Sequence, residues 1–153
     1  MDAYNTNIDT SQKTRLMSCL ISKCNQITQE LNRRMMDSFS LSFAKYEVLV
    51  AVDSAEGGEI TMSNLSRELL VSNANMTGMI SRLQSDELVE KKITPSDRRI
   101  YSVELTLEGR EVLEKAKSRH CQWIEEMTAN IGNDDLGEMN DFLSKISNAN
   151  EYI

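Results

Sequence analysis

The chain has 153 residues, of which 40% are hydrophobic and 27% are charged, and its formal net charge is -7. This length and composition suit one ordinary globular domain or two small lobes and exclude a disordered tail. No uncharged apolar run reaches the length of about 18 residues that a membrane span needs, and the N-terminus is polar, so we expect neither a membrane span nor a secretory signal and place the protein in the cytoplasm.

Two helices are expected in the first third of the chain. From Ser11 to about Asp37 the segment lacks glycine and proline, and its apolar residues recur at helical spacings: Leu16, Leu20, Ile27, Leu31 and Met35. A second helix is predicted after the SFSLS break, with Ser42 as its N-cap, and the EGGE stretch ends it.

Two short helical runs follow, separated by a tight turn. The first is TMSNLSRELL and the second is VSNANMTGMISRLQSDE, and each carries apolar residues at helical spacing. A pair of short helices joined this closely is typical of a helix-turn-helix.

Alternating apolar residues after Leu88 predict a β-hairpin over residues 89–105. Its turn holds Pro95, the single proline of the chain, with Lys91 and Lys92 before it and Arg98 and Arg99 after it. Closing the turn would concentrate these cations, which suits contact with DNA phosphates or the minor groove. Asp97 lies between them, and we interpret it as the residue that orients Arg99. The alternative is a solvated, charged turn that protects a sheet edge.

A long helix is expected from Thr106, its N-cap, to about Ile131, followed by a last helix over roughly 134–148. The first helix and the long helix from Thr106 are too long for a lobe of about 65 residues to bury, so a C2 homodimer is the simplest way to cover them. The predicted fold class is therefore mainly α with a small hairpin wing. A winged helix-turn-helix lobe (41–106) lies between a dimerisation helix (1–40) and C-terminal dimerisation helices (107–153).

The second helix of the helix-turn-helix offers a surface for DNA. If Met76, Ile80 and Leu83 point inward, the opposite face is small and uncharged, with Asn75, Thr77 and Arg82 beside it. Small residues allow the helix backbone to approach the floor of a major groove. Asparagine can pair with adenine there, and arginine with guanine. The alternative is that SNAN only caps a helix and that Arg82 is a solvated charge. Gly78 favours the first interpretation, because a glycine within a helix costs about 1 kcal/mol relative to alanine and suggests that something comes close, although a neighbouring helix would explain it equally.

Other chemistries find little support in the sequence. With one histidine and three unpaired cysteines, no zinc site of the usual spacing is possible, and we expect no metal and no cofactor. His120 and Cys121 are neighbours that point about 100° apart on a helix, and no GxSxG, HExxH or phosphate-loop motif occurs, so we predict that the protein is not an enzyme.

The stretch from Ile60 to Gly109 resembles the central region of the MarR family of bacterial transcription regulators. The resemblance rests on the helix-turn-helix pattern, the D-x-R of the wing (Asp97 and Arg99) and the final LT..G (Leu105, Thr106 and Gly109). It implies an obligate homodimer on a palindromic operator. Asp86 and Glu87 depart from the pattern, since they replace its usual glycine.

The resemblance also implies contact residues. At the recognition helix and the wing, the DNA-binding residues would be Ser72, Asn73, Asn75, Thr77, Arg82, Lys91, Lys92, Asp97, Arg98 and Arg99. Most members bind small aromatic or phenolic acids, and the residues that would line such a site here are Arg15, Arg33, Arg34, Phe39, Phe43 and Tyr46.

Two further questions stay open. Peroxide-sensing members use a cysteine in the first helix, which suggests Cys19, but the aligned position here is Ser18, and a buried, unreactive thiol is the alternative. The preferred function is a DNA-binding repressor released by a small-molecule effector. The alternatives are a thiol-based repressor and a winged-helix adaptor that does not bind DNA, the latter favoured by the acidic total charge.

Overall fold

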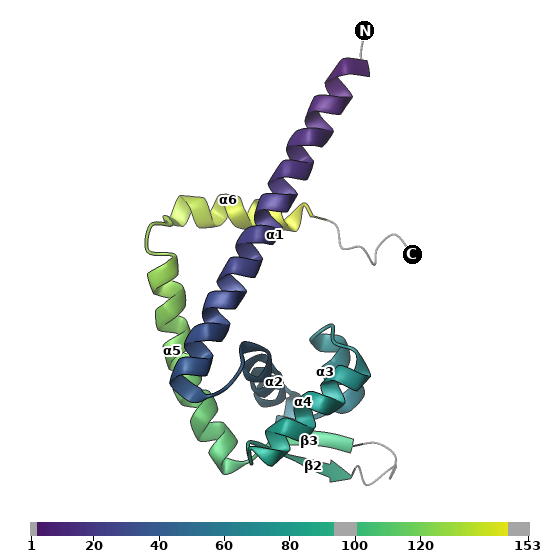
Figure 1. Cartoon of the computed structure of the whole chain (residues 1–153), viewed down its shortest axis with the longest axis vertical. Helices are drawn as coiled ribbons and strands as arrows, with labels where there is room; N and C mark the ends of the chain where they lie inside the picture. Colours follow the sequence, from purple (N-terminus) through teal and green to yellow (C-terminus); the bar gives the residue numbers. More distant parts are fainter. Residues whose placement is uncertain (1–2, 94–100, 147–153) are drawn as a thin grey trace. The chain divides into compact units, whose positions relative to one another are not determined.

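The computed structural model describes residues 3–93 and 101–146 and forms two compact units, which divide after Ser118. Helices dominate both units, and a small antiparallel sheet lies in the first (Figure 1). The prediction of a mainly α chain with a small β element is confirmed.

The first helix, α1 (Ala3–Phe39), begins eight residues earlier than its apolar periodicity suggested. Ser40, with a positive φ of 52°, follows its end. The next helix, α2 (Phe43–Ser54), begins where predicted, because the Ser42 hydroxyl accepts a hydrogen bond from Lys45 N at 3.3 Å. The side-chain carbonyl of Asn32 accepts a bond from Phe43 N at 3.0 Å and so ties the two helices together.

The helix-turn-helix consists of α3 (Met62–Glu68) and α4 (Asn73–Ser85). Thr61 and Ser72 cap the two helices, each by accepting a hydrogen bond at 3.3 Å from the backbone N–H three residues later. Leu70 in the turn between them has a φ of 53°, and Glu87, just after α4, has a φ of 58°. Glu87, one of the two residues that stand in place of the usual glycine, therefore has a left-handed conformation, which favours glycine.

The sheet has three strands, not the two of the predicted hairpin. Strands β2 (Val89–Ile93) and β3 (Tyr101–Leu105) pair antiparallel as expected, but β1 (Glu59–Thr61), which follows the short 3-10 helix η1 (Glu56–Gly58), pairs with the other edge of β3. The order is β1-β3-β2. A strand of three residues is too short to show a period of two, so its sequence carries no signal.

The core of the first unit lies between the sheet and α2, α3 and α4. Its fully or nearly fully buried side chains come from all of these elements: Val48, Leu49, Val52, Leu65, Met76, Ile80, Leu83, Val89, Val103 and Leu105. Burying one such side chain stabilises a fold by about 1.5 to 3 kcal/mol, so this core holds α4 in a fixed position.

The last helices are α5 (Leu107–Met127), which ends four residues before the predicted Ile131, and α6 (Asn133–Ser144). Thr106 caps α5 as predicted, by accepting a bond from Gly109 N at 2.9 Å. Trp123 on this helix is buried. Among the described residues, no helix is long and apolar enough to cross a membrane.

Candidate nucleic-acid interface

The helix α4 is anchored by its inner face and capped at its N-terminus. Met76, Ile80 and Leu83 are completely buried, and the helix contacts α3 and β2. At the other end, Lys45 Nζ of α2 lies 2.7 Å from the Asp86 carboxylate, an ion pair that joins residues 41 positions apart and that the sequence did not suggest. Both ends of α4 are therefore held.

The outer face of α4 is exposed and bears the polar side chains that the sequence assigned to it. Asn73, Asn75, Thr77 and Arg82 are all exposed, as is Ser72 at the cap. The Thr77 hydroxyl donates to Asn73 O at 2.8 Å, which orients it along the helix and leaves its methyl group exposed for contact. The N-terminus of α4 adds backbone N–H groups and a positive helix dipole, both suited to a phosphate.

Gly78 lies in the middle of this face. A Cβ built at this position meets no atom within 4 Å of the described chain. Packing within the chain therefore does not require a glycine here, and a glycine within a helix lowers its stability by about 1 kcal/mol relative to alanine. Open space at this position is compatible with close approach of a surface outside the chain.

The two lysines of the wing point to opposite sides of the sheet. Lys91 pairs with buried Val103 and is half-buried, whereas Lys92 pairs with Ser102 on the other face, where its ammonium lies 2.6 Å from Glu104. Both lysines lie on β2 as expected, and they point to opposite faces because neighbouring residues of a strand alternate between faces. Asp97, Arg98 and Arg99, together with Pro95, lie outside the described residues, and the orienting role of Asp97 stays a prediction.

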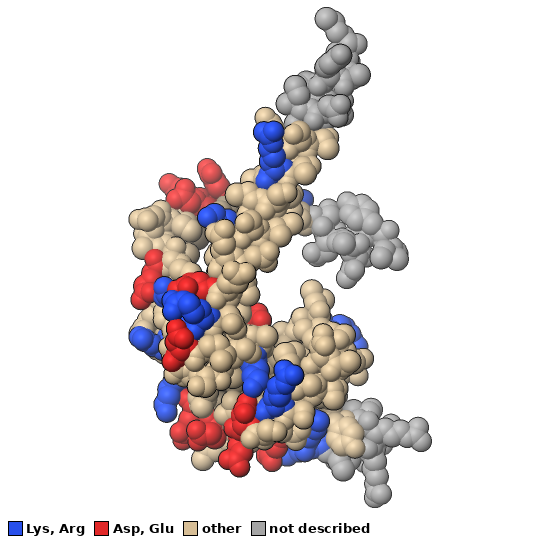
Figure 2. Space-filling view, viewed as in Figure 1, with Lys and Arg blue, Asp and Glu red and all other residues tan. Residues whose placement is uncertain are grey.

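Charge is mixed over the lobe formed by residues 41–106. Its seven cations and ten anions give a formal charge of -3, so the local excess of one positive charge over 61–99 does not extend to the whole lobe. On the face seen in Figure 2, basic and acidic side chains lie interspersed. Attraction to DNA therefore depends on where the cations lie and not on the total.

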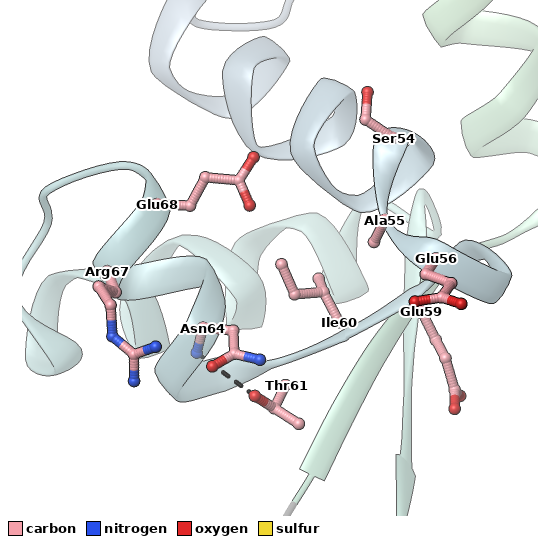
Figure 3. Close-up of a pocket in the computed structure, with 9 residues that line it drawn as sticks. All are labelled: Ser54, Ala55, Glu56, Glu59, Ile60, Thr61, Asn64, Arg67 and Glu68. Atoms are coloured by element: carbon pink, nitrogen blue, oxygen red, sulfur yellow. Dashed lines mark hydrogen bonds between the residues drawn. The ribbon is translucent and has the colours of Figure 1, made fainter.

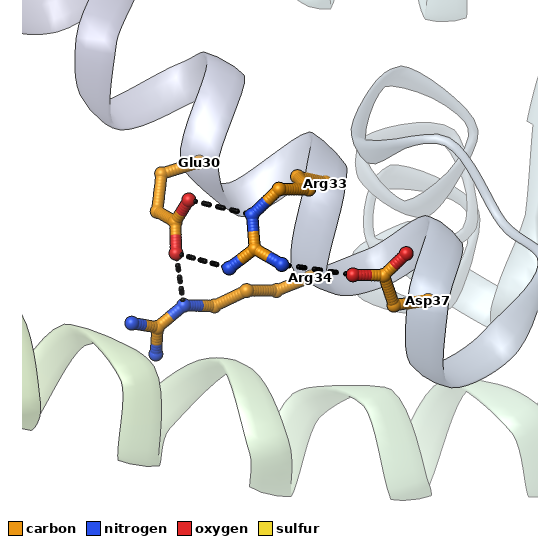
Figure 4. Close-up of polar contacts among 4 residues, drawn as sticks. All are labelled: Glu30, Arg33, Arg34 and Asp37. Atoms are coloured by element: carbon orange, nitrogen blue, oxygen red, sulfur yellow. Dashed lines mark hydrogen bonds and ion pairs between the residues drawn. The ribbon is translucent and has the colours of Figure 1, made fainter.

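Two of the three arginines assigned to an effector site, Arg33 and Arg34, make ion pairs with acidic neighbours on the same helix. Arg33 makes a two-pronged contact with Glu30 at 2.7 and 2.9 Å and a third with Asp37 at 2.9 Å, and Arg34 shares the Glu30 carboxylate at 2.7 Å (Figure 4). These contacts lower the pKa of Glu30 to about 2, chiefly through the hydrogen bonds from Arg33 and Arg34. An anionic effector would have to compete with these carboxylates.

The other residues of that assignment divide into two groups. Phe43 and Tyr46 stack, with ring centroids 5.7 Å apart, and Phe39 is half-buried. Arg15 is exposed on α1 18 residues before Arg33, which is about 27 Å along a helix. Within one chain, Arg15 is not brought to the same place as the aromatic residues.

A surface pocket of about 500 Å³, which the sequence did not suggest, lies in the first unit. Its lining comes from the end of α2 through α3: Ser54, Ala55, Glu56, Glu59, Ile60, Thr61, Asn64, Arg67 and Glu68 (Figure 3). Three carboxylates and one guanidinium make this lining acidic, so it does not suit an aromatic acid.

The three cysteines are free thiols, and all are exposed. The alternative of a buried, unreactive Cys19 is therefore not what the single chain shows. In the part of the chain that the structure describes, His, Cys, Asp and Glu side chains form no group suited to hold a metal ion.

Comparison with known proteins shows that the sequence is similar to bacterial transcription regulators. The model of the MarR family matches residues 41–101. The Bacillus subtilis regulator YdgJ, whose function is uncharacterized, is 30% identical over 108 residues, which cover 71% of this chain and 65% of that protein. The transcriptional repressor YetL of the same species is 27% identical over 112 residues, which cover 71% and 67%. The chain thus matches about two thirds of the length of these relatives.

The fold is also found in solved structures. A mutant MarR from E. coli, complexed with operator DNA, superposes with a TM-score of 0.75 and 25% sequence identity over 95% of this chain and 98% of that one. The predicted winged helix-turn-helix architecture is confirmed by this similarity, and the similarity extends beyond the central lobe to the flanking helices.

Proposed function

Because the chain belongs to the MarR family of transcription regulators, we propose that it binds a DNA operator, sequence-specifically, with α4 in the major groove. Members of this family are regulators and not enzymes. The observation that carries the proposal is the outer face of α4, where exposed Asn73, Asn75 and Arg82 flank a glycine that nothing within the chain requires. Asparagine and arginine at such positions read adenine and guanine.

The proposal includes a homodimer on a palindromic operator, with repression as the outcome. Two related lobes would place two α4 helices in successive major grooves, one helical turn apart. Exposed apolar residues on α1 and α6, among them Leu16, Ile27 and Leu143, supply surface for a second copy. The name of YetL, a repressor, supports the sign of regulation. At the wing, Arg98 and Arg99 would contact phosphates or the minor groove, with Asp97 orienting Arg99.

Binding to a duplex that the purified protein selects from a random pool tests the proposal. Affinity should fall with salt by about 0.9 in the log-log slope for each phosphate neutralised. Arg82→Ala should weaken binding by about 1 to 3 kcal/mol and relax the preference for one base pair. The matched control is Arg119→Ala, which removes an exposed arginine of α5 that is bonded to Gln122 at 2.9 Å. Salt-insensitive binding, or equal effects of the two variants, contradicts the proposal.

The regulatory signal in this proposal is a small aromatic or phenolic acid that fills a site near the corner of α1 and α2. Stacked Phe43 and Tyr46, half-buried Phe39 and Arg34 of α1 offer the chemistry for it, although Glu30 competes for the guanidinium. A thermal-shift screen with phenolic acids and with hydroperoxides, on wild type and Cys19→Ser, separates ligand sensing from thiol sensing. Stabilisation by a phenolic acid in both proteins supports the ligand; a response to peroxide that Cys19→Ser abolishes supports the thiol, because Cys19 is exposed.

A second candidate function, an adaptor that dimerises without binding DNA, is favoured by the formal charge of -3 on residues 41–106. The same selection experiment decides between the two. An adaptor would enrich no sequence from the pool, whereas the proposed regulator enriches one palindrome.

A further inference from the structure

A row of three carboxylates crosses the outward face of the sheet. Glu104 on β3 pairs directly with Glu59 on β1 and with Glu90 on β2. Like charges directly opposite one another in a sheet destabilise it, so this row needs compensation. The Ser102 hydroxyl donates to Glu59 at 3.3 Å, and Lys92 Nζ lies 2.6 Å from Glu104 Oε1. Lys92 is thus part of the sheet's charge balance.

The register of β2 with β3 shows in which direction along the strand the Lys92 side chain reaches to meet Glu104. Lys92 pairs with Ser102, two residues nearer the hairpin turn than the pair Glu90 and Glu104. The ion pair therefore draws the ammonium of Lys92 back along the strand, away from the turn and toward the base of the wing.

The two partners are not equally exposed. The Glu104 side chain is 20% exposed and that of Lys92 is 53% exposed, so the carboxylate is the more fixed partner. The hydrogen bond from Lys92 lowers the pKa of Glu104, and the same bond raises the pKa of Lys92. Both groups are therefore ionised at neutral pH. A side-chain hydrogen bond between Glu90 and Glu104 also lowers the pKa of Glu104 and raises that of Glu90, and the nearby charge of Arg110 lowers the pKa of Glu104 further.

We infer that Glu104 is a positioning residue that withholds the Lys92 ammonium from DNA phosphate, so the wing binds DNA with one cation fewer than its sequence offers. This inference rests on the proposed DNA binding. A phosphate can take Lys92 only by displacing Glu104, and exposed ion pairs contribute modestly, so the restraint is partial. Glu104 thereby moderates affinity without itself contacting DNA.

The test compares two charge-neutralising variants on the same face of the sheet. Glu104→Gln releases Lys92, whereas Glu59→Gln removes an equal charge from a carboxylate bonded to Ser102. The probe is the duplex that the wild-type protein selects from a random pool. Glu104→Gln should bind about two- to fivefold more tightly than Glu59→Gln. Its log-log salt slope should be steeper by up to about 0.9, the value for one additional phosphate contact.

Both substitutions are then repeated in a Lys92→Ala background. The extra gain of Glu104→Gln, in affinity and in slope, should vanish there, because no ammonium remains to be released. Equal effects of the two glutamate variants, or an extra gain that persists without Lys92, overturn this inference and leave the proposed function standing. If the wild-type protein selects no duplex, the proposed function fails and this inference fails with it.

Discussion

Two residues of the helix-turn-helix lobe hold backbone conformations that favour glycine. Leu70 has a φ of 53° and Glu87 a φ of 58°, and the Leu70 side chain is also 88% exposed. The left-handed conformation costs a residue with a Cβ about 1 to 2 kcal/mol. A glycine at the same position avoids this cost, but its greater conformational freedom in the unfolded chain offsets part of the gain. The surrounding turns impose these conformations.

Leu70→Gly should therefore raise the free energy of unfolding by about 0.5 to 1 kcal/mol. Urea unfolding followed by circular dichroism measures it. The control is Leu70→Ala, which shortens the exposed side chain but keeps a Cβ in the left-handed conformation and should not produce this gain. A gain of equal size in both variants would mean that removal of exposed apolar surface, and not backbone strain, is responsible.

Glu30 makes part of the stability depend on pH. Its two arginine partners lower its pKa from the ordinary value of 4.5 to about 2, so the ionised form favours the folded helix. This contribution is complete above about pH 4.5 and is lost as the pH falls toward 2. Glu30→Gln should unfold more readily than wild type at pH 7 and as readily near pH 2. Thermal unfolding of both proteins between pH 7 and pH 2 measures this. A difference in unfolding temperature that stays constant over this pH range would show that the ion pairs do not stabilise the fold.

At the scale of the elements, the junction between the sheet and α5 leaves no room for a side chain at Gly109. A Cβ on Gly109 would overlap the backbone carbonyl of Leu88. That same carbonyl accepts from Thr106 N at 3.1 Å, and Gly109 N donates to the Thr106 hydroxyl. Neither backbone segment can move away without loss of these bonds.

We expect Gly109→Ala to lower the free energy of unfolding by about 1 to 3 kcal/mol, the range for overpacking. Gly78→Ala is the matched control, because its new methyl group meets no atom within 4 Å and should raise helix stability by up to about 1 kcal/mol. Chemical denaturation of both variants checks the opposite signs. Gly78→Ala should also weaken DNA binding, since the methyl group would keep α4 away from the groove floor; unchanged affinity would count against close approach at this residue.

At the scale of the whole molecule, apolar surface remains uncovered in the single chain. Leu16 and Ile27 on α1 are 51% and 45% exposed, and no residue of α6 is buried. Exposed apolar surface on a long helix indicates a partner. The proposed homodimer would cover it.

Ile27→Glu should accordingly shift the protein from dimer to monomer, as measured by light scattering across a dilution series. Burying a charge without a partner in an apolar interface is strongly unfavourable. The control is Gln29→Glu, which adds the same charge about 200° around the helix from Ile27. Dissociation of both variants would point to charge in general, and a dimeric Ile27→Glu protein would exclude this face from the interface.

Much of the architecture follows from local sequence. Helix starts at Ser42 and Ser72 were predictable because a capping hydroxyl bonds a backbone N–H only three residues away. The exposed polar face of α4 was predictable for the same kind of reason, since the inward residues Met76, Ile80 and Leu83 fix the opposite face through the helical period. Interactions of short sequence separation decide these features.

Tertiary structure decided the features that depend on distant residues. The strand β1 exists because 59–61 pair with 102–104, and its own three residues carry no period. Lys92 is held by Glu104 because the register of β2 with β3 places them together, whereas the sequence predicted a DNA contact for Lys92 and no role for Glu104. Lys45 and Asp86 meet across 41 residues in the same way. The sequence by itself determined the order of the main helices and of the hairpin and which face of α4 is exposed and polar, whereas strand register and helix packing decided that Lys45 and Lys92 are held by carboxylates.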